Sequence, residues 1–592
     1  MVISIFFITI NSFLLMYKLA YFQHLRHNNM RAIIFQVSDS KHLYSIFYIL
    51  LSLILLFFSY FPVYSNYRQA PAGSFYYGAT GNYPLDMIGN LASVYEGYLG
   101  HLRRFSKSTT TVYSQPTFIK FEYLLIGHLA RIFNSDPLIM FYLTRFIITI
   151  LFLIFIGFVL IPGLFNNFLS RIIAAVLVLF STGILPAIYD DNIRILLTFP
   201  PDIYPFQRLT TTAHHYLLGS FFSLLAFFFL SKAVDSPKKL YYILPPVFGF
   251  LTAFVFTPSA IMLILSLPVF IILYSKTYPL KKNYKKYRNI FILFLTFIAA
   301  SIIPVVYLLR VSEFFEFNTF YKTEQIAPYN INPVNYIFIV GISYLLALFS
   351  ISKVFRKSNT LLFFFLSFTL VHPIAVFLLP GLLSVNKIRF FLTPYHFIFA
   401  FLATYGILSL SDFFHTKFLI LSRYFFIGLF TVIPLFSSWY VYSMSFNQQK
   451  NCFCQWQFFD YGNPKKDLMD AIFWLRKNSA EDDIVLSGYY AGTLIPAFSG
   501  NKVYTSWWFR LMQPDNFKEV SGNIQNFFSG NISPETALSF LKKEKINFIF
   551  FSDEEMNNYA GSKSLKYPFL KPVFQKNNTI IYQVDEKLKT VF

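Results

Sequence analysis

Asp86 is the residue of this sequence that we expect to carry out acid–base chemistry. It stands in the run Asn82-Tyr83-Pro84-Leu85-Asp86, at the start of a predicted helix in a long polar stretch between two apolar segments. A carboxylate so placed can take the proton of a hydroxyl group while that oxygen forms a new bond. The alternative is that Asp86 only begins the helix, where the helix dipole favours a negative charge.

Two cations stand in a late connection between apolar segments, in the run Asn386-Lys387-Ile388-Arg389-Phe390. A guanidinium can bind two oxygens of a phosphate in a fork, so Arg389, with Lys387 beside it, is a candidate phosphate-binding residue. The alternative is a long basic side chain that reaches the anionic headgroups of the membrane.

Another polar group lies around residues 187–215 and consists of Asp190, Asp191, Asp202, His214 and His215. Carboxylate oxygens suit Mg²⁺ or Mn²⁺, so the three aspartates are candidate metal ligands. Adjacent acids at the end of an apolar segment are also typical of a solvated terminus. The two histidines either line a cavity or form a hydrogen-bonded structural pair.

The composition predicts that these residues are held by a membrane protein. Mean hydropathy is +0.51, hydrophobic residues make up 55% of the chain and charged residues 13%, which excludes an ordinary soluble composition. Apolar runs long enough for spanning helices lie near 43–63, 138–160, 172–189, 212–231, 240–257, 259–275, 290–310, 334–352, 359–380, 391–411 and 418–440. We therefore expect a polytopic α-helical protein with eleven transmembrane helices, or twelve if residues 2–22 also span.

Residues 1–42 allow three interpretations. The apolar run 2–22 is a true first span, an uncleaved anchor, or an upstream extension of a chain that starts naturally at Met30. A removed signal peptide is disfavoured because no small-residue cleavage site follows the run.

The basic connections predict the orientation of the chain. Lysine and arginine gather at 232–239, 276–288 and 353–357, which fall on one face of the predicted bundle and should be cytoplasmic. Residues 64–137, the Arg389 connection and residues 441–592 then lie on the outer, extracytoplasmic side of the membrane. The net charge of +21 follows from this topology and from contact with membrane lipid, so it gives no reason to expect nucleic acid.

The outer connection 64–137 is too long for a simple turn and predicts structure of its own. Apolar residues recur at helical spacing over 84–105 and again over 116–133, which indicates two amphipathic helices at the membrane interface. Glu96 follows Asp86 by ten residues, roughly 15 Å along a straight helix, so the two should not share one small site.

Residues 441–592 differ in composition and predict a separate α/β domain outside the 43–440 membrane domain. Helices are expected over 464–479, 517–528 and 533–545, with strands over 483–487, 502–506, 546–552, 570–574 and 579–584. The domain has no Gly-rich phosphate loop and no nucleophile motif. Its aromatic pair, Trp507-Trp508, is a candidate for stacking on a sugar or for the membrane interface.

An outer first loop with an early aspartate and two interfacial helices resembles the GT-C class of integral-membrane glycosyltransferases. The resemblance implies a bacterial-type cell-envelope enzyme of the inner membrane that takes a hexosyl or pentosyl group from a polyprenyl-phosphate donor. In that class the early aspartate, here Asp86, is the catalytic base or orients the acceptor, and a late basic residue, here Arg389, holds the lipid phosphate. Acids of the second outer loop help oligosaccharyltransferases of the class to bind a divalent metal.

The sequence departs from two patterns of this class. Met87 follows Asp86 where protein mannosyltransferases have a glutamate, and Phe509 follows Trp507-Trp508 where oligosaccharyltransferases have an acid. Two rival functions therefore stay open: a catalytically silent relative that works as a binding or assembly module, and a transporter of lipid or polysaccharide. Transporters often show repeated halves, which this chain does not clearly show.

Overall fold

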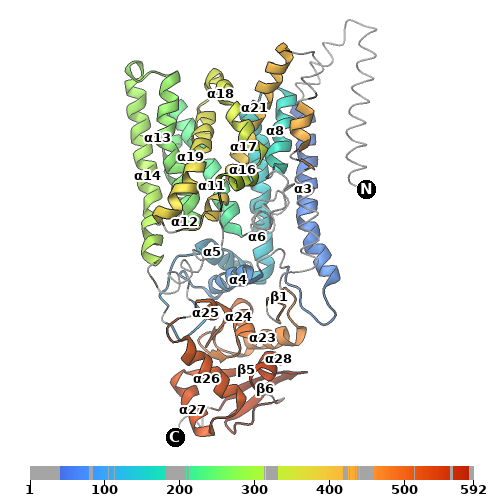
Figure 1. The fold of residues 1–592 in the computed structure, drawn as a ribbon. Helices are drawn as coiled ribbons and strands as arrows, with labels where there is room; N and C mark the ends of the chain where they lie inside the picture. The colour runs from blue at the N-terminus through green and yellow to red at the C-terminus, as the bar shows by residue number, and fades with distance from the viewer. Residues whose placement is uncertain are drawn as a thin grey trace.

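The computed structural model places a helical bundle at one end of the molecule and a sheet domain at the other, with two short helices between them (Figure 1). It describes residues 41–592 without 79–83, 105, 113, 182, 184–208, 210–212, 313, 315–330, 384, 418–424, 426, 434, 437, 438, 440–454, 457, 458, 461, 513, 561–563 and 586–592. The predicted span 2–22 lies outside the described residues.

Seven helices in this described part are long and apolar enough to cross a membrane. They are α3 (Lys41–Gln69), α6 (Pro137–Ile154) continued by η1 (Phe155–Leu160) and α7 (Ile161–Leu164), α11 (His214–Asp235), α13 (Thr257–Thr277), α14 (Tyr284–Ser312), α19 (Thr360–Leu383) and α21 (Tyr395–Lys417). Shorter helices complete the bundle: α8 (Phe168–Phe180), α12 (Lys239–Val255), α16 (Pro333–Val340), α17 (Ile342–Phe349), α18 (Ile351–Lys357) and α20 (Ile388–Phe391). The membrane class is confirmed, whereas the count of eleven or twelve spans stays a prediction.

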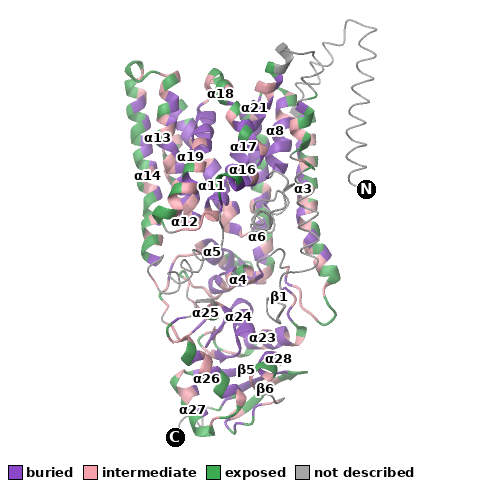
Figure 2. Ribbon diagram, viewed as in Figure 1, coloured by how far each residue is buried: buried purple, intermediate pink, exposed green. Residues whose placement is uncertain are grey.

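Burial separates inner from peripheral helices. In α19 and α21, 72% of the apolar window is buried, against 22% in α3 and 28% in α14. Exposed apolar side chains cover the outward faces of α3 and α14 (Figure 2). Because a soluble protein would not expose so much apolar surface, these faces are suited to contact with lipid.

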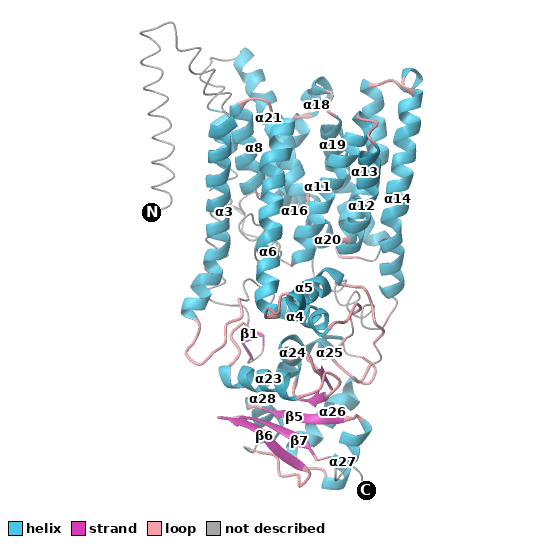
Figure 3. Cartoon of the chain, turned by 180° about the vertical axis from the view of Figure 1, so that it is seen from behind, coloured by secondary structure: helices cyan, strands magenta, loops and turns pink. Residues whose placement is uncertain are grey.

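The three basic connections meet at one end of the bundle. The Thr360 hydroxyl donates to Asp235 Oδ1 at 2.6 Å, and the Tyr278 hydroxyl donates to the Ser358 carbonyl at 3.4 Å. These contacts join the connections at 232–239, 276–288 and 353–357. The C-terminal domain lies beyond the opposite end (Figures 1 and 3). This arrangement is the one the orientation prediction requires, although the sidedness itself stays a prediction.

The C-terminal domain is a mixed five-stranded sheet in the order β4-β3-β5-β7-β6, covered by helices (Figure 3). The first three strands are parallel, and β6 and β7 form an antiparallel hairpin. Its elements are α23 (Lys466–Asn478), β3 (Ile484–Leu486), α24 (Tyr489–Phe498), β4 (Lys502–Val503), α25 (Trp507–Met512), α26 (Phe517–Ser529), α27 (Pro534–Lys543), β5 (Ile546–Phe551), α28 (Asp553–Glu555), η4 (Met556–Ala560), β6 (Leu570–Lys576) and β7 (Thr579–Val584). A short hairpin, β1 (Gln455–Trp456) and β2 (Phe459–Asp460), precedes them. The predicted α/β class is confirmed.

The first outer loop and this domain share one hydrophobic core. The loop helices are α4 (Pro84–Leu99) and α5 (Phe121–Ile132), and buried residues of both pack in the same cluster as α23, α24 and the sheet. Backbone hydrogen bonds add to this contact, since Lys466 N donates to the Gly73 carbonyl and Val503 N to the Lys107 carbonyl. The sequence predicts a separate domain, but its apolar surface is completed by the loop, which fixes the domain over α4.

Two buried glutamates close the first turn of α24. Both oxygens of Glu554 accept from Tyr490 N at 3.0 Å, while Glu555 accepts from Gly488 N and from Ser552 N. A helix N-terminus carries unpaired N–H groups and a partial positive charge. Burial raises the pKa of both carboxyls, and the backbone N–H groups oppose that rise. These side chains thus supply internally the hydrogen-bond acceptors that such a helix end needs.

Replacing Gly488 by alanine is expected to destabilise this domain. The added Cβ would lie 2.3 Å from Glu554 Cδ, and Gly488 has a negative φ, so the effect comes from crowding and not from backbone strain. Overpacking of this kind costs about 1–3 kcal/mol. Thermal unfolding followed by near-ultraviolet circular dichroism measures it. Gly522→Ala is the control, since nothing lies within 4 Å of its added Cβ and alanine favours the helix.

Candidate functional site

Asp86 lies in the first turn of α4, exposed on the side of the helix that also carries Asn90. Lys120, the residue before α5, donates from Nζ to the Asn90 amide oxygen at 2.7 Å. Lys120 has a positive φ of 60°, which turns the chain sharply into α5. The predicted helix start is confirmed, and it brings the aspartate close to a half-buried ammonium group.

The first turn of α5 adds a buried carboxylate. Glu122 is 8% exposed, and its Oε1 lies 4.0 Å from Nδ1 of His215 in the first turn of α11. The same His215 nitrogen is hydrogen-bonded to the Tyr123 hydroxyl at 3.0 Å. The interfacial helix α5 is thereby joined to the end of a membrane helix through polar side chains.

Arg389 lies on the short helix α20 and contacts the first turn of α11. Its Nη1 donates to the Tyr216 hydroxyl at 3.0 Å, beside His215. His372 Nε2 donates to the carbonyl of the next residue, Phe390, at 3.2 Å, and the Tyr336 hydroxyl donates to Nδ1 of the same histidine at 2.9 Å. His372 therefore fixes the helix that carries Arg389, a satisfied histidine in the bundle core.

The charge of Lys120 responds to several of these groups. Burial lowers the pKa of Lys120 to about 8, with further lowering by Arg104 and Arg389, while Asp86 and Glu122 oppose it. The pKa of Lys120 thus responds to both of the residues singled out in the sequence, Asp86 and Arg389. We call Asp86, Asn90, Lys120, Glu122, His215 and Arg389 the interfacial site.

Burial raises the pKa of Glu122 to about 7, although its own backbone N–H, Lys120 and Arg104 lower it. The unfolded chain releases this proton near the ordinary value of 4.5, so the stabilising contribution is full below about pH 4.5 and is lost as pH rises through 7. Glu122→Gln removes this dependence. As pH rises from 4.5 to 7.5, we expect the free energy of unfolding of the variant to increase relative to that of the wild type by about 1–3 kcal/mol. Parallel melting curves test this, with the exposed Glu519→Gln as control.

Other predicted residues lie elsewhere. Lys387 donates to the Ile331 carbonyl at 3.1 Å and lies over the Phe377 ring, so its ammonium has partners of its own. His214 is fully buried, with Nε2 hydrogen-bonded to the Phe141 carbonyl at 2.9 Å. Of the two interpretations of the histidine pair, His214 fits the structural one, whereas His215 enters the interfacial site.

The tryptophan pair lies at the contact between the C-terminal domain and α4. Trp507 is 9% exposed and carries the guanidinium of Arg510 over its ring. Trp508 is half-buried, and its ring lies within ordinary contact distance of a Cβ placed on Gly89. Trp508 is therefore near the helix turn that carries Asp86, while sugar stacking stays a prediction.

The predicted metal ligands Asp190, Asp191 and Asp202 lie outside the described residues. Within the described part, one group of residues could hold a metal ion: Glu96, His101 and Glu481. It is a different set from the one the sequence suggested, so binding of Mg²⁺ or Mn²⁺ by the three aspartates stays a prediction.

Sequence reasoning missed Asn90, Lys120 and Glu122. A signal for two of them was present, because Lys120 and Glu122 put opposite charges at the start of an otherwise apolar helix. For Asn90 the only signal in the sequence was its spacing of four residues from Asp86, which places both on one helix face.

No protein-family model matches the chain, and no curated protein matches it. Several solved structures are similar to this chain. One is the Archaeoglobus fulgidus oligosaccharyltransferase tethered with an acceptor peptide, 13% identical, with a TM-score of 0.49, covering 87% of this chain and 70% of that one. Another is the arabinofuranosyltransferase AftD from Mycobacteria, 13% identical, with a TM-score of 0.48, covering 93% of this chain and 40% of that one.

Both neighbours are sugar transferases by name, and the likeness to each is weak, with a TM-score below 0.5 at 13% identity. At these TM-scores it assigns neither a donor nor an acceptor, and the chain spans well under half of the arabinofuranosyltransferase.

Proposed function

We propose that this chain is a GT-C glycosyltransferase that moves a sugar from a polyprenyl-phosphate donor to a hydroxyl acceptor on the outer face of the membrane. The observation that supports the proposal is a chain of contacts from α4 to α20. Lys120 donates to Asn90, one turn beyond Asp86, and Arg389 donates to Tyr216, beside the His215 that lies 4.0 Å from Glu122. A carboxylate beside two cations provides a base and a phosphate-binding pair.

In the proposed reaction, the acceptor oxygen attacks the anomeric carbon of the sugar. Asp86 takes the acceptor proton, and the bond between that carbon and the phosphate oxygen breaks in the same step. The lipid phosphate leaves with the bonding electrons. Arg389 and Lys120 stabilise the charge that develops on it, because fixed cations favour the state in which the negative charge has formed.

The surroundings of Arg389 suit a lipid-linked donor. A small cavity lies between α11 and the α20–α21 segment, and its lining includes Tyr216, which accepts from Arg389. Most of its other lining residues are apolar, among them Leu217, Phe391 and Phe397. The cavity holds only about one water molecule, so a lipid chain beside Arg389 would require these apolar side chains to move apart.

The test is transfer of labelled sugar from a panel of polyprenyl-phosphate donors in membranes that contain the chain. We expect transfer by the wild type and none by a variant carrying both Asp86→Asn and Arg389→Gln at matched expression. The exposed Asp515→Asn should behave as the wild type.

Two other results would contradict the proposal. Absence of transfer by the folded wild type from every donor would favour a binding module or a transporter. Equal transfer by the wild type and the double variant would place the chemistry elsewhere in the chain.

A further inference from the structure

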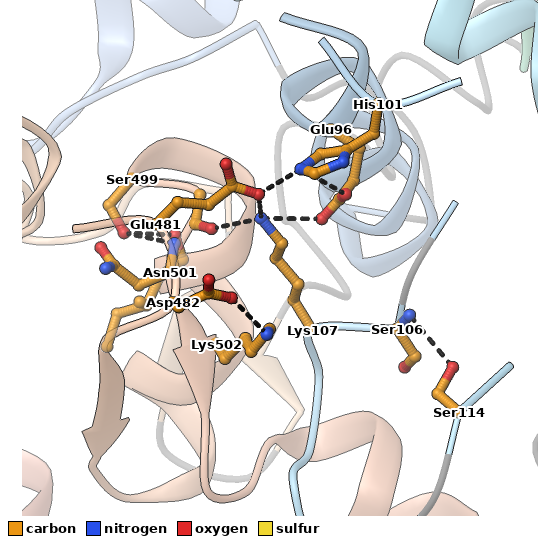
Figure 4. Close-up of polar contacts among 12 residues, drawn as sticks. Glu96, His101, Ser106, Lys107, Ser114, Glu481, Asp482, Ser499, Asn501 and Lys502 are labelled. Carbon is orange, nitrogen blue, oxygen red and sulfur yellow. Dashed lines mark hydrogen bonds and ion pairs between the residues drawn. The ribbon is translucent and has the colours of Figure 1, made fainter. Parts of the chain in front are cut away.

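A second polar cluster joins the first outer loop to the C-terminal domain (Figure 4). Glu96 lies near the end of α4, His101 and Lys107 follow it, and Glu481 lies between α23 and β3. His101 Nε2 contacts Glu481 Oε1 and lies 3.9 Å from Glu96 Oε2. One ligand atom from each of these three residues lies within 4.8 Å of the other two.

An unsatisfied oxygen points into this cluster. Glu96 is 2% exposed, and its Oε2 is buried without a hydrogen-bond partner. An unpaired buried carboxylate oxygen is costly, so its position next to an imidazole nitrogen indicates a missing positive partner. Glu96 Oε1, in contrast, is satisfied by Lys107 Nζ at 3.0 Å.

Lys107 organises the cluster from one side. Besides Glu96, its ammonium contacts Glu481 Oε1 at 3.2 Å and donates to the Gly500 carbonyl at 2.8 Å. With Lys107 held by that carbonyl, the two carboxylates both face Nε2 of His101 (Figure 4). Their two negative charges exceed the single charge of Lys107 when His101 is neutral, which leaves a net charge of −1 for a cation.

We propose that Glu96, His101 and Glu481 bind a divalent transition metal, with Zn²⁺ as the best match. One imidazole nitrogen and two carboxylate oxygens are a ligand set that zinc accepts, and hard cations such as Mg²⁺ prefer oxygen alone. The His101 and Glu481 side chains are 31% and 33% exposed, so solvent can supply a fourth ligand and the ion has a route in. Lys107 then hydrogen-bonds both ligating carboxylates from behind.

This metal would join two parts of the chain and would not take part in the proposed transfer. Glu96 lies ten residues beyond Asp86 in the same helix, so the ion would fix the far end of α4 to the C-terminal domain. The proposal is independent of the proposed function, because it concerns metal uptake and stability alone.

The experiment measures metal content in the purified full-length chain. After treatment with EDTA, the protein is dialysed against Zn²⁺, Co²⁺, Mn²⁺ or Mg²⁺ and assayed by mass spectrometry of the metals. We expect about one equivalent of Zn²⁺ or Co²⁺, a visible Co²⁺ absorption band and a higher melting temperature. His101→Ala and Glu481→Gln should each lose that equivalent, whereas His42→Ala, at the exposed start of α3, should keep it.

Two results would overturn the proposal. The first is no stoichiometric uptake of any of the four ions by the folded wild type. The second is uptake that persists unchanged in both ligand variants. Either would identify the cluster as an ion-pair network that binds no specific metal. Because Glu481 is partly exposed and glutamine preserves its shape, loss of metal in Glu481→Gln without loss of folding separates binding from misfolding.

Discussion

Replacing Asp86 by asparagine is expected to reduce sugar transfer by about 100- to 10,000-fold. Asparagine has the same shape but cannot accept the acceptor proton. The loss should fall on kcat, because the proton moves only in the transition state. Transfer of labelled sugar under saturating donor measures the effect.

This substitution should change the stability of the folded state very little. Asp86 is exposed, and a negative charge in the first turn of a helix is worth only about 0.3–1 kcal/mol. An unchanged melting curve with lost transfer would therefore assign a chemical role to Asp86. Transfer at the wild-type rate would instead limit Asp86 to beginning the helix.

Replacing Gly127 by valine is expected to abolish most transfer by a different route. Helices α4 and α5 cross in backbone contact at two glycines: a Cβ on Gly127 would lie 2.0 Å from the Val94 carbonyl oxygen, and one on Gly97 would lie 2.0 Å from the Leu124 carbonyl oxygen. A larger residue must push the helices apart. Since α4 carries Asp86 and the start of α5 carries Glu122, a displacement of about 1 Å should cost about 100-fold in rate.

This variant should also lose stability, by about 1–3 kcal/mol or more, because the obstructing atoms are backbone and cannot move aside. Gly127→Ala gives an intermediate case. Gly163→Val is the matched control, since nothing lies within 4 Å of its added Cβ. If Gly127→Val melted and reacted as the wild type does, the close crossing of α4 and α5 would be wrong.

Much of the secondary structure was predictable because its determinants are local. The predicted strands over 570–574 and 579–584 are β6 and β7, which form an antiparallel hairpin with Asn577 in its turn at a positive φ of 47°. Helix α23 was expected over 464–479 and runs from Lys466 to Asn478. In each case turn residues and apolar periodicity act within about 15 residues.

Helix α24 shows where local reasoning fails. All ten of its residues are buried, so it has no polar face and no amphipathic pattern to indicate it. The shared core of loop and domain was also hidden, since the pattern of an apolar face does not name its partner. Glycines such as Gly97 and Gly127 look like helix breakers in sequence and become understandable only when two backbones meet.

The interfacial site was half predictable. Asp86 and Arg389 could be chosen because charge is rare in an apolar chain, and each marks an exception to a pattern. Their common influence on Lys120 depends on how α4, α5 and α20 pack. No spacing rule within the sequence connects residues that are some 300 positions apart.

Glu554 and Glu555, at the N-terminus of α24, fill a position that binds phosphate groups in other proteins. Parallel strands that lead into a helix at Gly488 form the geometry in which many α/β proteins seat a nucleotide, but Glu554 and Glu555 occupy it. The two carboxyl groups accept from the backbone N–H groups that a diphosphate would use. The helix end is therefore filled from within, and a diphosphate could bind there only by displacing both side chains.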